Sequence, residues 1–519
     1  MKRVLLLIVM LSTCQIFGQA DSTQSFLKVK QLKNSIRLNY IMVGMPTDQV
    51  SYNLEPKMSL MGLNYNISLN DWLYTGAGFH AAITGDQGGL FTLGVNLGVN
   101  KKIYNNLYFD ANIHFGGGGG FRTLVNGGGI IYPNVGLQYK MKDFSFGVQY
   151  GQVNFFTGII KNENVSFFVE IPSILRFGSY QKASEKFALE NINGKSFTDK
   201  PAVKSVQQVT FDFFFPVGDS RKDSPQNFAP ITNTLAIIGY EYQRYLNTNT
   251  FVYVHTDAMY SGLVAGFMDL FFGVGKNFVE TDRVNLFAKF GVGAAGGRIF
   301  PENGLTIYPS AGLDVRVTEK FGLSAHGGYH RAVGGTFEAY TAGISLKYYG
   351  LTGGSKNPFT DEKMETVKTQ GIQIGVYNQT YYDVAKFGIP DSDLNLIAIK
   401  IIYDISKRFY ASGEASFAYE GRSGGYAHGI FGLGIRTNRF FKEKISVFSE
   451  MGFGVAGGGR IDTGEGVLVR PIVGFNYHIN NDFSFNFSGG QMISPYGNVN
   501  STNINIGLTY GLSILNSKK

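Results

Sequence analysis

Cysteine is almost absent from this chain of 519 residues, since Cys14 is the only one. A single cysteine excludes an intrachain disulfide and a thiolate metal site. Charged residues make up only 16% of the chain, whereas about 25% is usual in soluble proteins. Beyond the N-terminus, no run of apolar residues is long enough for a membrane-spanning helix. If this chain crosses a membrane, it is therefore expected to do so with strands.

Proline is also scarce, with 14 residues, whereas glycine (68), phenylalanine (44) and tyrosine (30) are abundant. Disordered segments lack aromatic residues, so this composition indicates a folded chain rich in β-strands. The net charge of +8 is modest for this length and comes with no cluster of lysine or arginine. Nucleic acid is therefore not predicted as a partner.

The N-terminus has the pattern of a secretory signal. Lys2 and Arg3 supply the positive charge, Val4–Leu11 supplies the apolar core, and Gly18 and Ala20 are the small residues that a signal peptidase requires. Residues 1–20 are therefore predicted to be a signal peptide, which implies export of the mature chain.

Three related glycine-rich stretches organise the rest of the sequence. They cover residues 115–139, 290–315 and 451–477, and each ends in a strand with the pattern Pro-x-x-Gly. Repetition at this spacing indicates a duplicated unit of domain size. The predicted organisation is repeat 1 (21–177), a linker (178–204), repeat 2 (205–350), a second linker (351–368) and repeat 3 (369–519).

Each repeat is predicted to contain about eight strands. In repeat 1 the strands are expected at 35–44, 57–68, 71–84, 89–100, 106–120, 127–140, 144–153 and 163–171. Tight polar turns alternate with longer loops, as in bacterial outer-membrane barrels, where the short turns lie in the periplasm. The fold class predicted is therefore all-β, a transmembrane antiparallel up-and-down barrel in the outer membrane, and both linkers are expected in the periplasm.

The residue pattern within one strand predicts which face meets lipid. In the segment 91–100, apolar side chains alternate with glycine, threonine and asparagine, so the two kinds lie on opposite faces. On a solvent-facing sheet, glycine weakens a strand because it has no side chain to pack against its neighbours. Inside a narrow barrel, small residues leave room for larger neighbouring side chains. The apolar face is therefore expected to point outward into lipid.

Polar residues before the glycine clusters lead to the same prediction. Aligning Phe115, Phe290 and Met451 places three polar residues at one equivalent position, namely His114, Lys289 and Glu450. A charge facing lipid at mid-depth would cost about 2–4 kcal/mol. These three side chains are therefore predicted to line the lumen. Interior ion pairs are also expected, among Asp110, Asp269, Glu414, Glu450, Lys289 and Arg436.

The last strand carries the sequence Gly507-Leu-Thr-Tyr510-Gly-Leu512. This pattern of glycine, aromatic and apolar residues resembles the closing strand of the small eight-stranded outer-membrane barrels of the outer membrane protein A and X type. The resemblance implies outer-membrane lipid as the surroundings, and the barrel-assembly machinery as the partner that recognises Gly507, Tyr510 and Leu512. Repeat 1 departs from the pattern, since its last strand lacks the glycine and runs into Pro172.

Three repeats of eight strands allow two architectures. Linkers of this length exceed a turn between paired strands, which favours three tandem barrels. The alternative is one 24-stranded barrel, whose wide lumen would normally need a plug.

Three patterns that could carry chemistry are better explained as parts of the barrel wall. The GxGxxG matches at 291–296 and 452–457 are followed by a loop and a strand rather than by the helix that a dinucleotide needs. His255 and Asp257 share a face, but no paired nucleophile accompanies them. His326 and His330 are four residues apart, which suits a metal on a helix but not on a strand. No cofactor, metal or catalysis is therefore predicted.

The predicted function is a structural or surface-interaction role in the outer membrane, with narrow, filled lumens. A porin-like channel formed by one large barrel is the first alternative, and an enzyme acting on lipid or peptide is the second. A ligand outside the cell or a periplasmic protein stays open as a partner.

Overall fold

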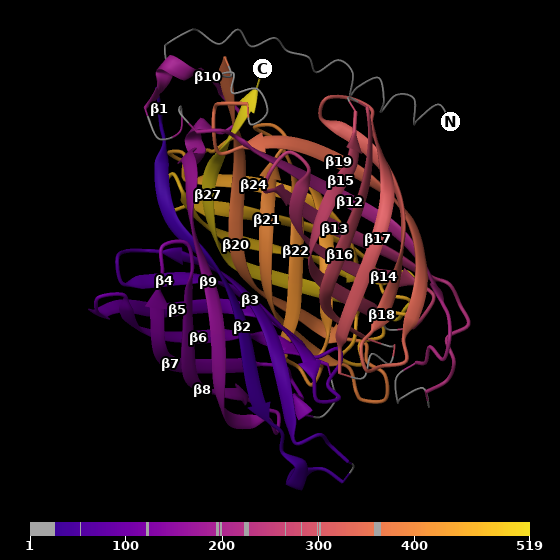
Figure 1. Ribbon diagram of the computed structural model, residues 1–519. Helices are drawn as coiled ribbons and strands as arrows, with labels where there is room; N and C mark the ends of the chain where they lie inside the picture. Colours follow the sequence, from indigo (N-terminus) through magenta and orange to yellow (C-terminus); the bar gives the residue numbers. More distant parts are fainter. Residues whose placement is uncertain are drawn as a thin grey trace.

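In the computed structural model, residues 26–518 are described except 52, 121–123, 194–196, 198, 199, 223–227, 265, 282, 298, 300–302 and 358–364. The predicted signal peptide lies outside these residues. Among the residues described, no helix is both long and apolar enough to cross a membrane. Most of the described chain forms antiparallel strands (Figure 1).

The strands form three sets of eight. Barrel 1 consists of β2 (Lys30–Gly44), β3 (Lys57–Ser68), β4 (Leu73–Thr84), β5 (Phe91–Tyr104), β6 (Leu107–Gly119), β7 (Ile130–Lys140), β8 (Ser145–Phe155) and β9 (Lys161–Ser179). Barrel 2 consists of β12 (Val203–Pro216), β13 (Leu235–Tyr245), β14 (Thr250–Ser261), β15 (Phe267–Glu280), β16 (Val284–Gly297), β17 (Leu305–Arg316), β18 (Phe321–Ala332) and β19 (Glu338–Thr352). Barrel 3 consists of β20 (Thr366–Val384), β21 (Ser392–Asp404), β22 (Phe409–Glu420), β23 (Ala427–Arg436), β24 (Ile445–Gly457), β25 (Val467–His478), β26 (Phe483–Ile493) and β27 (Asn500–Lys518).

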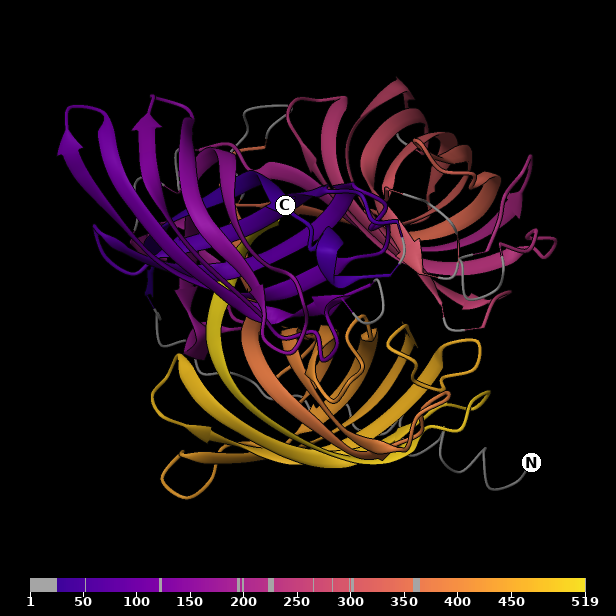
Figure 2. The same ribbon diagram turned by 90° about the horizontal axis from the view of Figure 1, so that it is seen from below.

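Each set closes on itself because its first strand pairs with its last. Strand β2 pairs with β9, β12 with β19, and β20 with β27, all antiparallel and over long registers. Within each set, consecutive strands pair with each other from the first strand to the last. The chain therefore forms three barrels rather than one barrel of 24 strands, and Figure 2 shows them side by side. The predicted all-β, up-and-down fold is confirmed.

The end of barrel 1 differs from the prediction. Strand β9 does not stop before Pro172 but continues to Ser179, with Pro172 opposite Ser35 of β2. Proline lacks an N–H but keeps an extended backbone, and the pairing of β9 with β2 continues on both sides of it.

The first predicted linker contains short strands as well as irregular chain. Strand β10 (Lys186–Ala188) pairs with β20 of barrel 3, and β11 (Ile192–Asn193) pairs with β1 (Leu27–Lys28). Of the first linker, β10 therefore extends the barrel sheet, whereas β11 and β1 form a separate two-stranded sheet.

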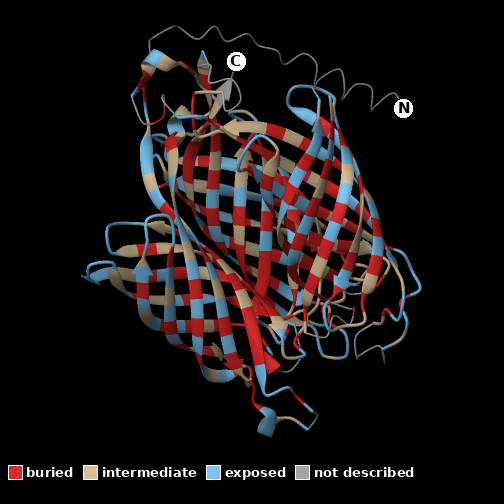
Figure 3. Cartoon of the chain, in the orientation of Figure 1, coloured by how far each residue is buried: buried red, intermediate tan, exposed pale blue. Residues whose placement is uncertain are grey.

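Burial alternates along the strands, as Figure 3 shows. On β19, Tyr340, Ile344 and Leu346 are 60%, 63% and 53% exposed, whereas Ser345 and Lys347, on either side of Leu346, are each 2% exposed. Similar rows of exposed apolar side chains run along the outer faces of all three barrels. Soluble proteins rarely expose apolar patches of this extent, whereas a closed barrel with an apolar outside and a polar inside is the form that crosses the outer membrane. The chain is an outer-membrane β-barrel protein.

Glycine residues bring the three barrels into contact near the longer loops. Gly89, which precedes β5, lies against Gly296 of barrel 2, and a Cβ built on Gly296 would be 1.9 Å from the Cα of Gly89. The other two contacts use corresponding positions, Gly266 against Gly457 and Gly425 against Gly119 and Gly120. The same two surfaces thus meet head to tail three times, which closes a ring of three.

Apolar side chains of all three barrels pack together at this junction. Phe91 and Leu93 of barrel 1, predicted to face lipid, are 3% and 9% exposed and belong to one cluster with Ala294 of barrel 2 and Phe417 of barrel 3. The first part of this face therefore meets neighbouring barrels instead of lipid, whereas Leu97 farther along the same face is 50% exposed. The alternation within one strand does not show which part of a face another barrel covers. The glycine clusters of the repeats are therefore contact surfaces as well as parts of the wall.

A fragment comprising residues 366–518 is expected to refold in detergent as a barrel, with the heat-modifiable gel mobility of folded barrels, because β20 and β27 close it without strands from barrels 1 and 2. A fragment ending at residue 499 lacks β27 and is the matched control that should not close. If the longer fragment stayed unfolded, the barrels would depend on one another for folding.

Candidate functional site: the barrel interiors

Apolar side chains fill the end of each barrel that lies next to the longer loops. In barrel 1 they come from strand ends and loops, and include Leu60, Leu124 and Phe155, each 0–1% exposed. Barrel 2 has a corresponding cluster around Phe214 and Leu235, and barrel 3 one around Leu394 and Leu468. Each lumen is therefore closed at this end by a packed apolar layer.

Below the apolar layer, barrel 1 holds an arginine between two carboxylates. Arg37 donates two parallel hydrogen bonds to Asp110, at 2.9 and 3.0 Å, and its Nε donates to Glu170 at 2.7 Å. Asn100 and Gln149 also donate to Asp110, at 2.9 and 2.8 Å. Arg37 is 4% exposed and Asp110 is 0% exposed, so the fork geometry and the amides satisfy charges that would be costly if left alone.

Barrel 3 is built on the same principle with different residues. Arg470 donates two parallel hydrogen bonds to Glu414, at 2.7 and 2.8 Å, and Lys400 donates to Glu450 at 2.7 and 2.9 Å. Arg436 forms a third ion pair with a carboxylate, that of Asp404, at 2.6 Å. The cavity that remains among these side chains measures about 20 Å³, which is room for about one water molecule.

Barrel 2 uses histidines where the other two use arginines. Lys289 is hydrogen-bonded to Glu241, and Lys347 to Asp314 at 2.7 Å. Three further buried carboxylates have only histidines as ion-pair partners among the described residues. These contacts are His326–Asp212 at 2.7 Å, His255–Asp257 at 2.8 Å and His330–Asp269 at 3.4 Å.

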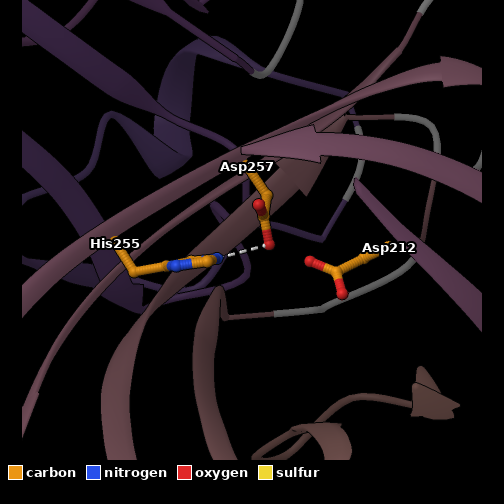
Figure 4. Close-up of side chains that lie close together, drawn as sticks. All are labelled: Asp212, His255 and Asp257. Carbon is orange, nitrogen blue, oxygen red and sulfur yellow. Dashed lines mark ion pairs between the residues drawn. The ribbon is translucent and has the colours of Figure 1, made fainter. Parts of the chain in front are cut away.

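His255 is the central side chain of this group. Its Nδ1 lies 2.8 Å from a carboxylate oxygen of Glu241, and its Nε2 faces Asp257, with the carboxylate of Asp212 beyond (Figure 4). The ligand atoms of Asp212, His255 and Asp257 all lie within 4.8 Å of one another. Each of the three residues is 1–2% exposed. Barrel 2 thus contains a buried group of several carboxylates and histidines, whereas the described residues of the other two barrels include a single such contact, His428–Glu414 of barrel 3 at 3.6 Å.

The structure places His114, Lys289 and Glu450 inside barrels 1, 2 and 3, at 1%, 6% and 3% exposure. Their predicted equivalence is wrong for His114. Lys289 and Glu450 lie opposite the residues that follow Pro309 and Pro471, whereas His114 lies opposite Tyr132, the residue before Pro133. The alignment matched Phe115 with Phe290 and Met451. The register is defined by strand pairing, and in barrel 1 it differs from this alignment by two residues.

The closing-strand residues all lie on β27. Gly507 is buried against the ring of Tyr377, the ring centroid of Tyr510 is 4.8 Å from that of Phe483, and Leu512 is 3% exposed where β27 also pairs with β9. Their role as an assembly signal stays a prediction.

The ion-pair partners of five predicted interior residues include five that were not predicted from the sequence, namely Arg37, Glu241, Lys400, Asp404 and Arg470. A local signal for them exists, because each stands between large apolar or aromatic neighbours within a strand or at its end, as Lys400 does in Ile399-Lys-Ile401. In a barrel in lipid, a charged residue flanked in this way must point inward.

No protein-family model and no curated protein sequence matches this chain. Solved structures that are similar to it include the siderophore receptor PirA from Pseudomonas aeruginosa, with 8% identity, coverage of 92% of this chain and 80% of that one, and a TM-score of 0.25. OccK8 (OprE) from Pseudomonas aeruginosa has 9% identity, coverage of 94% and 99%, and a TM-score of 0.22. A designed transmembrane β-barrel covers 29% of this chain and 98% of its own length, with 15% identity and a TM-score of 0.19. Similarities at these TM-scores carry no argument about function.

Proposed function

We propose that this chain is a pore-less outer-membrane protein with a structural or surface-interaction role. The observation that carries the proposal is the apolar layer that closes every lumen next to the longer loops. A solute would have to displace side chains such as Leu60, Phe155 and Leu468, which are 0–1% exposed. No catalysis is assigned to the chain.

The features that remain for function are on the outside. Short turns and the linkers lie at one end of the barrels and the longer loops at the other. With the short turns in the periplasm, the longer loops of all three barrels face the exterior as one surface, held together by the glycine junction. Such a surface suits adhesion or binding of an external ligand, and the wide apolar wall suits a contribution to membrane integrity.

The purified chain is expected to produce little or no conductance in planar lipid bilayers, because no lumen is open along its length. An open porin measured in the same bilayers is the control for insertion and detection. Stable, reproducible conductance steps from the chain would overturn the proposal.

A porin-like channel is the second candidate. The feature that favours it is the polar lining below each apolar layer, with cavities of about 20 Å³ in barrel 3 and about 10 Å³ in barrel 1. Since strand pairing closes each barrel at eight strands, passage would have to follow a single lumen. Conductance that rises when Leu468 in the apolar layer is replaced by glycine would favour this candidate.

A further inference from the structure

The interior of barrel 2 has the features of a metal site. We propose that Asp212, His255 and Asp257 bind one divalent transition-metal ion, of which Zn²⁺ is the best match. One imidazole nitrogen and carboxylate oxygens form a ligand set that Zn²⁺ accepts in four-coordinate sites. This inference is independent of the proposed function, since a bound ion would fill the lumen further and would not open it.

Each of the three ligand residues has a buried polar atom without a hydrogen bond. His255 Nε2, Asp257 Oδ2 and Asp212 Oδ2 are all buried, and none has a hydrogen-bond partner. His255 Nε2 and Asp257 Oδ2 approach to 2.8 Å, but without the geometry of a hydrogen bond. Unsatisfied buried polar atoms are costly, and a cation bound between these three atoms would satisfy all of them together (Figure 4).

The groups behind the ligands are arranged as around a metal. Glu241 lies 2.8 Å from His255 Nδ1 and is held in turn by Lys289. An N–H at Nδ1 that donates to Glu241 leaves the lone pair of Nε2 free to bind an ion, which is the usual carboxylate–histidine–metal arrangement. His326 Nε2 lies 2.7 Å from the other oxygen of Asp212 and fixes that carboxylate.

Glycines make room for the two carboxylates. Gly239 pairs with Asp257 across the sheet, and Gly343 pairs with Asp212. A Cβ at Gly239 would be 1.8 Å from Asp257 Oδ1, and one at Gly343 would be 1.7 Å from Asp212 Oδ1. Any larger residue at either position would therefore displace a ligand.

Asp269 lies outside the group of three ligands. It is directly opposite Asp257 in the pairing of β14 with β15 and is 0% exposed, but its carboxylate contacts His330 at 3.4 Å and does not belong to the group whose ligand atoms lie within 4.8 Å of one another. Three protein ligands leave the fourth position of a tetrahedral Zn²⁺ ion to a water molecule.

The test is to refold the full-length, tag-free chain in detergent, once with Zn²⁺ and once with a chelator. Free metal is then removed, and bound zinc is measured by mass spectrometry. About one Zn²⁺ per chain is expected after refolding with zinc, together with a higher temperature of loss of the folded gel mobility. A folded chain that retains far less than one zinc would overturn the proposal.

Variants locate the ion within the chain. The double substitution His255→Gln/Asp257→Asn is expected to abolish stoichiometric zinc, whereas His114→Gln, a buried histidine of barrel 1 that contacts Asn96, should leave it unchanged. If the double variant does not fold, Glu241→Gln is the milder test and is expected to weaken zinc binding about 10–100-fold. Zinc that stays bound at full stoichiometry in the double variant would overturn the proposal.

Discussion

Replacing Arg470 by methionine is expected to lower the free energy of unfolding by about 3–5 kcal/mol, the cost of leaving one partner of a buried ion pair alone. Arg470 is 1% exposed and provides both of the short, parallel hydrogen bonds to Glu414. After its loss, Glu414 has His428 at 3.6 Å and Lys400 at 3.8 Å, and Lys400 already pairs with Glu450. Denaturant titration of the folded chain in detergent, followed by the gel-mobility difference, measures the effect.

Two further variants separate the ion pair from general damage. The double substitution Arg470→Met/Glu414→Leu removes both charges and is expected to recover most of the lost stability, because a buried pair replaced by apolar groups is often neutral. Lys33→Met removes an ion pair with Asp71 whose side chains are 78% and 95% exposed, and no measurable change is expected there. A double variant as unstable as Arg470→Met would show that the charge left unpaired is not the cause.

Replacing Gly296 by leucine is expected to separate barrels 1 and 2. The Cβ of a leucine at position 296 would be 1.9 Å from the Cα and 2.4 Å from the N of Gly89. These are backbone atoms, which cannot move away as the end of a flexible side chain can. Overpacking of this kind costs about 1–3 kcal/mol, and here it acts on contacts between barrels, whereas the hydrogen bonds that close each barrel stay intact. The expected result is three folded barrels in which barrels 1 and 2 no longer keep a fixed arrangement.

Spin labels on Asp48→Cys and Asp219→Cys measure the arrangement, because both residues are exposed, one on barrel 1 and one on barrel 2. The distance distribution is expected to be narrow in the parent and broad in Gly296→Leu. Gly413→Leu is the matched control, since a Cβ there meets no atom within 4 Å. A narrow, unshifted distribution in Gly296→Leu would show that the glycine contacts do not hold the barrels together.

Much of the fold is predictable from period-two alternation and turns. Strand β3 has the predicted bounds 57–68, and the other strands of barrel 1 lie within a few residues of theirs, except that β9 continues past Pro172. Alternation reports which residues share a face, and the repeat indicates sets of eight strands. The choice between three barrels and one barrel of 24 strands depends on the pairing of the first strand of each set with its last.

What covers a face is not predictable in this way. Phe91 and Leu93 have the same pattern as lipid-facing residues, yet they pack against other barrels. Pairing across the lumen is equally hidden, since Arg37 and Glu170 are 133 residues apart in sequence. The register between paired strands is also not predictable from a sequence alignment, because His114 lies two residues away from the position that the alignment gave it.

A ring of three separate, identical subunits would have to repeat every change of an interior three times, and it would fall apart on dilution. Here the linkers join the barrels covalently, so the effective concentration of each for the others is fixed by the chain. Freed from exact symmetry, the three interiors can diverge while the outer ring is kept. The interiors differ in this way, since barrels 1 and 3 contain arginine–carboxylate pairs and barrel 2 contains the carboxylate–histidine group. One barrel can therefore acquire a specialised interior without a change in the interiors of the other two.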